Sequence, residues 1–208
     1  MVIKAIDQIE ADAPELAAFY QEALLMKSCK HPGVAKVIEV IENSSYLFIV
    51  TQFYEGADLF NWMEAQSEEP MKEQTLRVFL RNLGETVSCL HAKSIIHRDI
   101  KPSNILLKGK SGISEPVLTD FGYAKNLSND PICTRMCGTK GYIAPEILRR
   151  KPYSFEADIW SLGALIYSLV SRQLPFPVLD EDINKQNLKV FARLVLETEL
   201  TFDGHRWS

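Results

Sequence analysis

The stretch His97-Arg98-Asp99-Ile100-Lys101-Pro102-Ser103-Asn104 decides how the rest of the chain is interpreted. Two shorter motifs follow it in order, Asp120-Phe121-Gly122 and Ala144-Pro145-Glu146. A given tripeptide arises by chance in roughly one chain in forty of this length, so either short motif alone would carry little weight. All three motifs in this order, each in a fitting context, form a far more specific combination.

The composition around these motifs is that of an ordinary folded domain. The chain has 208 residues, of which 46% are hydrophobic and 24% are charged, and this excludes a disordered or collagen-like chain. With 23 Lys and Arg against 27 Asp and Glu, the net charge is −4. The chain therefore lacks the basic excess that would predict a nucleic-acid partner. No apolar run reaches the roughly 18 residues of a membrane span. Four irregularly spaced cysteines predict reduced thiols in a cytoplasmic or nuclear protein.

The spacing of apolar residues predicts an α+β fold, in which a strand-rich front of the chain precedes a helix-rich remainder. A first helix is expected to begin at Asp12, with Glu15 completing a capping box, and to end at His31-Pro32-Gly33. The other expected elements are strands at 37–41, 46–50, 105–107 and 117–118, a loop at 109–114, a long amphipathic helix at 76–90, and a helix at 155–171 that is buried nearly all round.

With its three motifs the chain resembles the eukaryotic protein kinase family over essentially all 208 residues. Lys101 and the segment from Gly138-Thr139 to Ala144-Pro145-Glu146 are similar to the serine/threonine-specific branch of that family. The resemblance implies a bilobal fold, in which residues 1–54 are the remainder of a small β-rich lobe with the hinge and residues 55–208 are a large helical lobe. It also implies transfer of the ATP γ-phosphoryl group to Ser or Thr of protein substrates.

The resemblance assigns the catalytic roles to five residues. Asp99 would accept or orient the proton of the substrate hydroxyl, and Lys101 would neutralise charge on the transferred group. Thr139 would bond to both Asp99 and Lys101 and form a wall of the acceptor site. Asn104 and Asp120 would offer an amide oxygen and a carboxylate to the Mg²⁺ ion that bridges the ATP phosphates.

The nucleotide site is implied in the same way. Lys4 would grip the α- and β-phosphates, and Glu22 would be its ion-pair partner. Thr51 would guard the rear of the adenine pocket, where the backbones of Gln52 and Tyr54 face the base. From the residues alone, Lys4 is equally explained as a lysine whose stem lies along a strand, and Glu22 as a solvated helix charge.

Three further positions complete this picture. Leu106 would be the floor under adenine, although its composition alone makes it a core residue. Asp58 would lie beside the nucleotide site and would be the remaining carboxylate for a substrate arginine. Asp158 would bond either to a helix N-terminus or to the backbone of residues 97–104, which the resemblance makes the catalytic loop. An apolar column linking the lobes is expected from Met26, Val37, His97 and Phe121.

The sequence departs from the family pattern at three places. The Gly-rich phosphate loop is expected before Val2, and the last helices of the large lobe, with the arginine that pairs with Glu146, are expected beyond Arg206-Trp207-Ser208. The 208 residues alone are therefore expected to be a truncated domain of low stability and activity. Arg135 stands where the family carries its phosphorylated threonine.

The segments Glu39-Val40-Ile41-Glu42 and Gly138-Thr139-Lys140-Gly141-Tyr142-Ile143 look most like the calcium/calmodulin-dependent kinase group. Calmodulin or another regulator would then act from outside the chain, and neither nucleic acid nor membrane is expected as a partner. One alternative is an inactive kinase-like fragment or pseudokinase scaffold, but Lys4, Glu22, Asp99, Asn104 and Asp120 are all in place. A small-molecule kinase is the other alternative, and it would usually lack the Gly138 to Glu146 segment.

Overall fold

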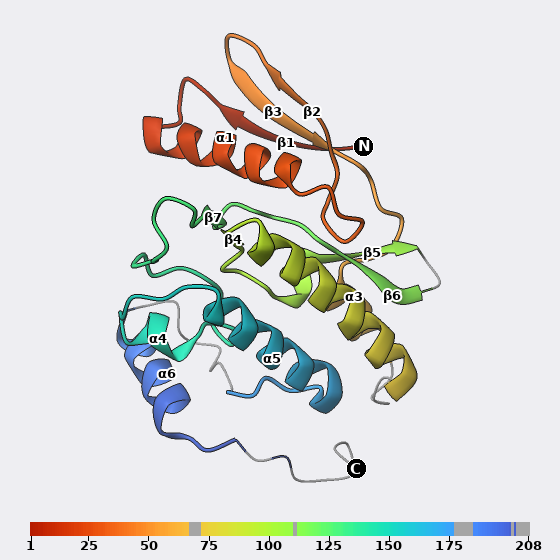
Figure 1. Cartoon of the computed structure of the whole chain (residues 1–208), viewed down its shortest axis with the longest axis vertical. Helices are drawn as coiled ribbons and strands as arrows, with labels where there is room; N and C mark the ends of the chain where they lie inside the picture. The colour runs from red at the N-terminus through yellow and green to blue at the C-terminus, as the bar shows by residue number, and fades with distance from the viewer. Residues whose placement is uncertain (67–71, 110–111, 177–184, 201, 203–208) are drawn as a thin grey trace.

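Two lobes lie one above the other in the computed structural model, which describes residues 1–66, 72–109, 112–176, 185–200 and 202 (Figure 1). The small lobe holds β1 (Val2–Asp7), α1 (Ala13–Ser28), β2 (Val37–Glu42) and β3 (Tyr46–Thr51). Its strands form one antiparallel sheet in the order β1-β3-β2, and Lys4 of β1 pairs with Ile49 of β3. The expected division into a strand-rich front and a helix-rich remainder is thus confirmed.

Helix α1 begins where the capping box predicted. The Asp12 carboxylate accepts the Glu15 backbone N–H at 2.8 Å, and the Glu15 carboxylate accepts the Asp12 N–H at 3.1 Å. These two bonds satisfy backbone donors that a helix start otherwise leaves unpaired. Phe19 and Ala23, one turn apart, pack against Leu47 and Ile49 of β3. The cap and this contact set the rotation of the helix, and with it the direction of Glu22.

The large lobe is mainly helical. Its elements are α2 (Leu59–Ala65), α3 (Glu73–Ala92), β4 (Ile95–Ile96), the 3₁₀ turn η1 (Pro102–Asn104), β5 (Ile105–Gly109), β6 (Gly112–Leu118), β7 (Lys125–Asn126), α4 (Pro145–Leu148), α5 (Glu156–Ser171) and α6 (Lys185–Glu197). Phe79, Leu83 and Leu90 of α3 are fully buried in the largest core cluster, together with Leu165 of α5. Among the described residues, no helix is long and apolar enough to cross a membrane.

Two expectations about this lobe were wrong in part. The loop expected at 109–114 is shorter, because β5 continues to Gly109 and β6 starts at Gly112, which pairs with it; residues 110 and 111 lie outside the described part. The helix expected to be buried all round exposes 57% of Ile159, since this side chain lines an open cavity of about 680 Å³ with Trp160 and Phe176. Helices α2, α4 and α6 lie where no helix was expected.

The hinge between the lobes runs close to β5. The Ala57 carbonyl accepts the Leu107 N–H at 3.0 Å, and Asp58 forms a β-bridge with Leu106. Gly56 lies so close to this strand that an added Cβ would meet the Leu107 carbonyl oxygen and would lie 2.8 Å from the Leu107 Cβ. Only a glycine therefore fits where the hinge meets the large lobe.

We expect Gly56→Ala to destabilise the chain by about 1–3 kcal/mol, because the clash is with backbone that cannot rotate away. The control is Gly84→Ala in the middle of α3, where an added Cβ meets nothing within 4 Å. That variant should gain up to about 1 kcal/mol from helix propensity. Chemical denaturation of both variants measures the difference, and equal midpoints would contradict the close approach at Gly56.

Candidate active site

A single buried carboxylate holds the loop that follows β4. Asp158, in the first turn of α5, is fully buried and accepts the backbone N–H groups of His97 at 2.9 Å and Arg98 at 2.8 Å. Its Oδ2 also contacts Nε2 of His91 at 2.8 Å. Two alternative partners were expected for Asp158, and in the structure its carboxylate bonds to the backbone of the catalytic loop. These bonds hold Arg98 at a φ of 69°, in the left-handed region that non-glycine residues seldom occupy.

The imidazole of His97 supports the same loop from inside. Burial lowers the pKa of His97, so the neutral ring is favoured. Nε2 lies 3.1 Å from the Thr119 carbonyl oxygen, and Nδ1 accepts the Asp99 N–H at 3.3 Å. Both contacts fit one tautomer, with the hydrogen on Nε2. The His97 ring also meets the Phe121 ring edge-on at 4.9 Å between centroids, and Phe121 and Met26 belong to one core cluster against which Val37 packs, as a column linking the lobes requires.

Asp99 lies at the centre of a compact polar network and is 3% exposed. Its Oδ1 accepts the Thr139 hydroxyl at 2.6 Å, and its Oδ2 lies 2.9 Å from both Lys101 Nζ and Asn104 Nδ2. Lys101 Nζ donates to Thr139 Oγ at 2.7 Å. The contacts expected between Asp99, Lys101 and Thr139 are therefore all present.

The Thr139 hydroxyl has only one arrangement in this network. Lys101 carries a charged ammonium group that can only donate, so the Thr139 oxygen accepts from it. The single hydroxyl proton then goes to the Asp99 carboxylate. A hydroxyl at this position therefore fixes Asp99 and Lys101 relative to each other. It does so from a residue that lies 40 positions after Asp99 in the sequence.

Asn104 and Asp120 offer oxygen atoms of the kind that Mg²⁺ binds. Asn104 donates through Nδ2 to both the backbone and the side chain of Asp99, each at 2.9 Å, so its amide oxygen faces away from Asp99. The Asp120 carboxylate is 48% exposed and remains accessible. No group of three or more acidic, His or Cys residues that could hold a metal occurs among the described residues. The two hard oxygen donors of Asn104 and Asp120 nevertheless fit Mg²⁺, which is commonly held by few protein groups together with substrate phosphates.

Lys4 and Glu22 join β1 to α1 across the small lobe. Lys4 Nζ lies 2.8 Å from both carboxylate oxygens of Glu22, and 3.5 Å from Asp120 Oδ1 in the large lobe. Burial alone would lower the pKa of Lys4, but its hydrogen bond to Glu22 and the charges of Glu22 and Asp120 outweigh burial and raise it. Burial raises the pKa of Glu22, and Lys4 offsets part of that effect. Because the Lys4 side chain is 50% exposed, its ammonium group stays open to a ligand.

The hinge residues lie beside β1 and β5. Thr51 ends β3 and pairs with Val2 of β1, a residue that is 47% exposed. The Gln52 N–H donates to the Lys36 carbonyl at 2.9 Å, so its own carbonyl is the hinge group at that residue that could meet adenine. Tyr54 is buried, and its hydroxyl accepts the Lys36 N–H at 3.1 Å. Leu106 is partly buried against the main core, as either interpretation of that residue required.

Asp58 has a role that the sequence interpretation missed. Its carboxylate caps α2, accepting the Asn61 N–H at 2.8 Å and the Asn61 side-chain amide at 2.6 Å. The carboxylate is therefore already used by the protein, and contact with nucleotide or with a substrate arginine stays a prediction. The signal was in the sequence, because an Asp three residues before Asn61 is a common start of a helix.

The segment between Phe121 and Tyr153 is ordered by contacts to Arg98. Arg98 Nε donates to the Tyr123 carbonyl at 2.6 Å, and its terminal nitrogen lies 3.4 Å from the Tyr153 hydroxyl. The Arg135 guanidinium lies 5.9 Å from the centre of the Tyr123 ring, and the Arg135 carbonyl accepts the Tyr153 hydroxyl at 2.6 Å. Arg135 thus contacts the rest of this segment through the Tyr123 ring. It stands at the position where the resemblance places a phosphorylated threonine.

A cavity of about 350 Å³ adjoins Lys101 and Thr139. Phe60, Met63 and Glu64 of α2 form one wall of it, and none of them was predicted as a site residue. No motif marks them, since only the fold brings α2 to the catalytic loop. Glu146, expected to lie without its arginine, forms no ion pair within the described part of the chain and lines the cavity beside Ile159.

Comparison with known proteins agrees with this geometry. The family model described as protein kinase domain matches residues 1–208. The serine/threonine-protein kinase ATG1a of Arabidopsis thaliana is 30% identical over 202 residues, which is 97% of this chain and 31% of that protein. The chain therefore spans about a third of the length of this curated relative. The family model matches this chain over its whole length, and the curated relative is 30% identical to it. The chain therefore belongs to the protein kinase family.

Proposed function

We propose that this protein is a serine/threonine protein kinase, which transfers the γ-phosphoryl group of ATP to Ser or Thr of protein substrates. The observation that carries the proposal is the network in which the Thr139 hydroxyl joins Asp99 to Lys101 at 2.6 and 2.7 Å. Such a network places a carboxylate and a cation beside one acceptor position. Phosphoryl transfer needs mainly that, because positioning and charge stabilisation supply most of its catalysis.

In the proposed reaction the substrate hydroxyl oxygen bonds to the γ-phosphorus as the bond to the ADP oxygen breaks. Asp99 orients that hydroxyl and takes up its proton. Lys101 offsets negative charge on the transferred group. Lys4, held by Glu22 and open on one side, would bind the α- and β-phosphates, while the backbones of Gln52 and Tyr54 hold adenine.

Mg²⁺, when bound, would neutralise the phosphate oxygens and orient them, and Asn104 and Asp120 are the residues that would hold it. Their donor atoms differ in how they are fixed. The Asn104 amide is locked by two bonds to Asp99 at 2.9 Å, whereas the Asp120 carboxylate is 48% exposed. We infer that Asn104 keeps a fixed direction and that Asp120 adjusts to the ion.

Three finer statements belong to the same proposal. The segments at 39–42 and 138–143 favour the calcium/calmodulin-dependent kinase group, with calmodulin or another regulator acting from outside the described residues. Protein substrates would enter the cavity beside Lys101 and Thr139. The irregular cysteines, all four free and three of them buried, support a cytoplasmic location, with the nucleus as the alternative.

We expect Asp120→Asn to lower kcat of the complete protein by at least about a hundredfold, because the charge that holds Mg²⁺ is lost. The fold should persist, since Asp120 has a φ of 58° and Asn tolerates this left-handed conformation as well as Asp does. The matched control is Asp7→Asn, whose side chain accepts N–H groups in a surface turn, as an amide also can. Turnover of the Asp120 variant equal to that of the control would refute the assignment.

We expect Thr139→Val to lower kcat by about ten- to a hundredfold, because it keeps the shape of the side chain but removes the hydroxyl that aligns Asp99 and Lys101. Thr139→Ser keeps the hydroxyl and should retain most of the activity. Steady-state kinetics with one peptide substrate separates kcat from KM. Activity retained in Thr139→Val and lost in Thr139→Ser would mean that the methyl group and not the hydroxyl matters.

The acceptor class has its own test. Phosphoamino-acid analysis of products made by the complete protein should give phosphoserine and phosphothreonine, because the Lys101 and Thr139 side chains leave room for a short acceptor beside Asp99. Asp99→Asn should abolish both products. Phosphotyrosine as the main product would overturn the serine/threonine assignment, and products that persist in the Asp99 variant would overturn the role of Asp99.

A further inference from the structure

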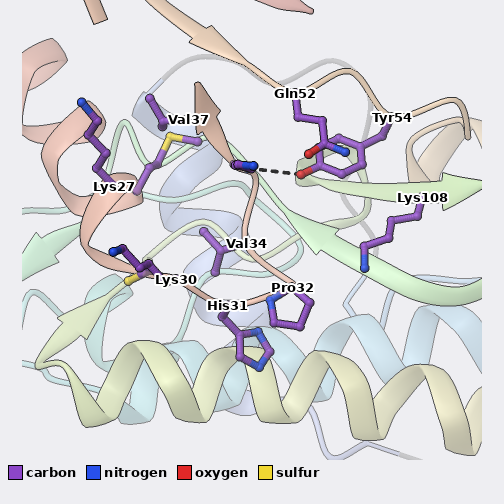
Figure 2. Close-up of a pocket in the computed structure, with 12 residues that line it drawn as sticks. Lys27, Lys30, His31, Pro32, Val34, Val37, Gln52, Tyr54 and Lys108 are labelled. Atoms are coloured by element: carbon purple, nitrogen blue, oxygen red, sulfur yellow. Dashed lines mark hydrogen bonds between the residues drawn. The ribbon is translucent and has the colours of Figure 1, made fainter. Parts of the chain in front are cut away.

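A cavity of about 620 Å³ opens on the side of the hinge where α1 ends. Its walls come from the last turn of α1, the segment that leads into β2, the hinge and β5. Figure 2 shows Lys27, Lys30 and Val37 on one side and Lys108 and Tyr54 on the other, with Val34 between them and His31 below Val34. Apart from the hinge residues Gln52 and Tyr54, none of its walls belongs to the nucleotide or acceptor sites described above.

The cavity is basic although the protein is acidic. Lys27, Lys30, Lys36, Lys108 and His31 line it, and no Asp or Glu is among the lining residues, whereas the whole chain has a net charge of −4. Lys108 has a loose partner, Glu115, at 3.7 Å. The other three lysines are exposed and form no ion pair with the described residues. Four cations are thus gathered around one hollow, and three of them have no counter-charge among the described residues.

The floor of the cavity is apolar and rigid. Val34, Met26 and Tyr54 are 3%, 4% and 8% exposed. The backbone of Lys36 is fixed at two points. Its N–H donates to the Tyr54 hydroxyl at 3.1 Å, and its carbonyl accepts the Gln52 N–H at 2.9 Å. His31 Nδ1 accepts the Gly33 N–H at 3.1 Å, so the neutral ring carries its hydrogen on Nε2. The cavity is therefore preformed, which lowers the entropy cost of binding.

We propose that this cavity is a docking site for an acidic peptide segment of a partner protein, with one apolar side chain seated on Val34 and Val37 and flanking carboxylates at the lysines. Charge complementarity selects the acidic partner. The concave apolar floor selects a peptide side chain, because a flat bilayer does not reach into a hollow. A nucleic-acid backbone, in turn, needs an extended basic track more than an apolar floor. The volume is within the range of pockets that enclose small groups.

The test measures binding of fluorescein-labelled peptides to the complete protein by fluorescence polarisation. An array of twelve-residue Asp/Glu peptides, each with one central Leu, Phe, Ile or Met, is the probe. The protein variants are the triple change Lys27→Glu, Lys30→Glu, Lys36→Glu and the milder triple change to Gln. The control is Lys189→Glu, an exposed lysine of α6 in the other lobe.

We expect at least one peptide to bind, and binding to weaken at least about tenfold in the Glu triple variant and less in the Gln variant, because each exposed ion pair contributes up to roughly fivefold. Lys189→Glu should bind as the wild type does. Raising the salt from about 0.1 M to about 1 M should weaken the wild-type complex. Replacing the central apolar residue of the peptide by Ser should weaken binding at every salt concentration.

Three results would overturn the proposal. No peptide of the array binds, or the best peptide binds both triple variants as tightly as the wild type. Alternatively, single-stranded RNA or vesicles of phosphatidylserine bind more tightly than every peptide and lose affinity in the triple variants, which would assign the lysines to nucleic acid or to a membrane surface. Far-ultraviolet circular dichroism and melting of each variant show that the fold is retained, as expected for exposed side chains.

Discussion

The rest of the site depends on the fully buried carboxylate of Asp158. A buried carboxylate is costly unless its oxygens are bonded, and here both oxygens accept backbone N–H groups of the loop while one also contacts His91. Three parts of the large lobe, α5, the end of α3 and the loop after β4, therefore have one relative position in which the charge is satisfied. Asp99 directly follows Arg98 in the sequence. The bond between the Arg98 N–H and Asp158 therefore also determines where Asp99 lies.

From that anchor, polar contacts extend to segments far away in the sequence. Asp99 reaches Thr139, and Lys4 reaches both Glu22 and, more weakly at 3.5 Å, Asp120. The first contact ties the segment after Phe121 to the loop, and the second ties β1 to α1 and the small lobe to the large one. In each of these contacts, a charged side chain is paired with a side chain from a different element. The arrangement of charges is therefore as sensitive to lobe packing as to the identity of the residues.

The sequence predicted those features that depend on neighbours along the chain. The capping box of Asp12 and Glu15 is local, as are the apolar runs that predicted strands at 37–41 and 46–50, and the three motifs carry the proposed catalytic residues in fixed spacing. What it could not predict depends on packing. Asp58 was interpreted by resemblance and not as the cap of α2, and Ile159 belongs to an apolar helix whose exposed side only the fold reveals. Phe60 and Glu64 become site residues only because α2 lies beside the catalytic loop.

The hinge shows how one extended segment serves two surfaces. The side chains of Gln52 and Tyr54, two residues apart, both line the basic cavity, as the alternation of extended backbone requires. The same residues carry the backbone groups proposed to hold adenine. Lys36 braces this segment through its peptide N–H and carbonyl, so the wall of the basic cavity is continuous with the hinge. A net charge of −4 gives no sign of the cavity, because the lysines at 27, 30, 36 and 108 come together only in the fold, where α1, the segment before β2 and β5 line one hollow. Electrostatic attraction of a partner follows the local field and not the sum over the chain, so an acidic protein can still bind an acidic segment at this place.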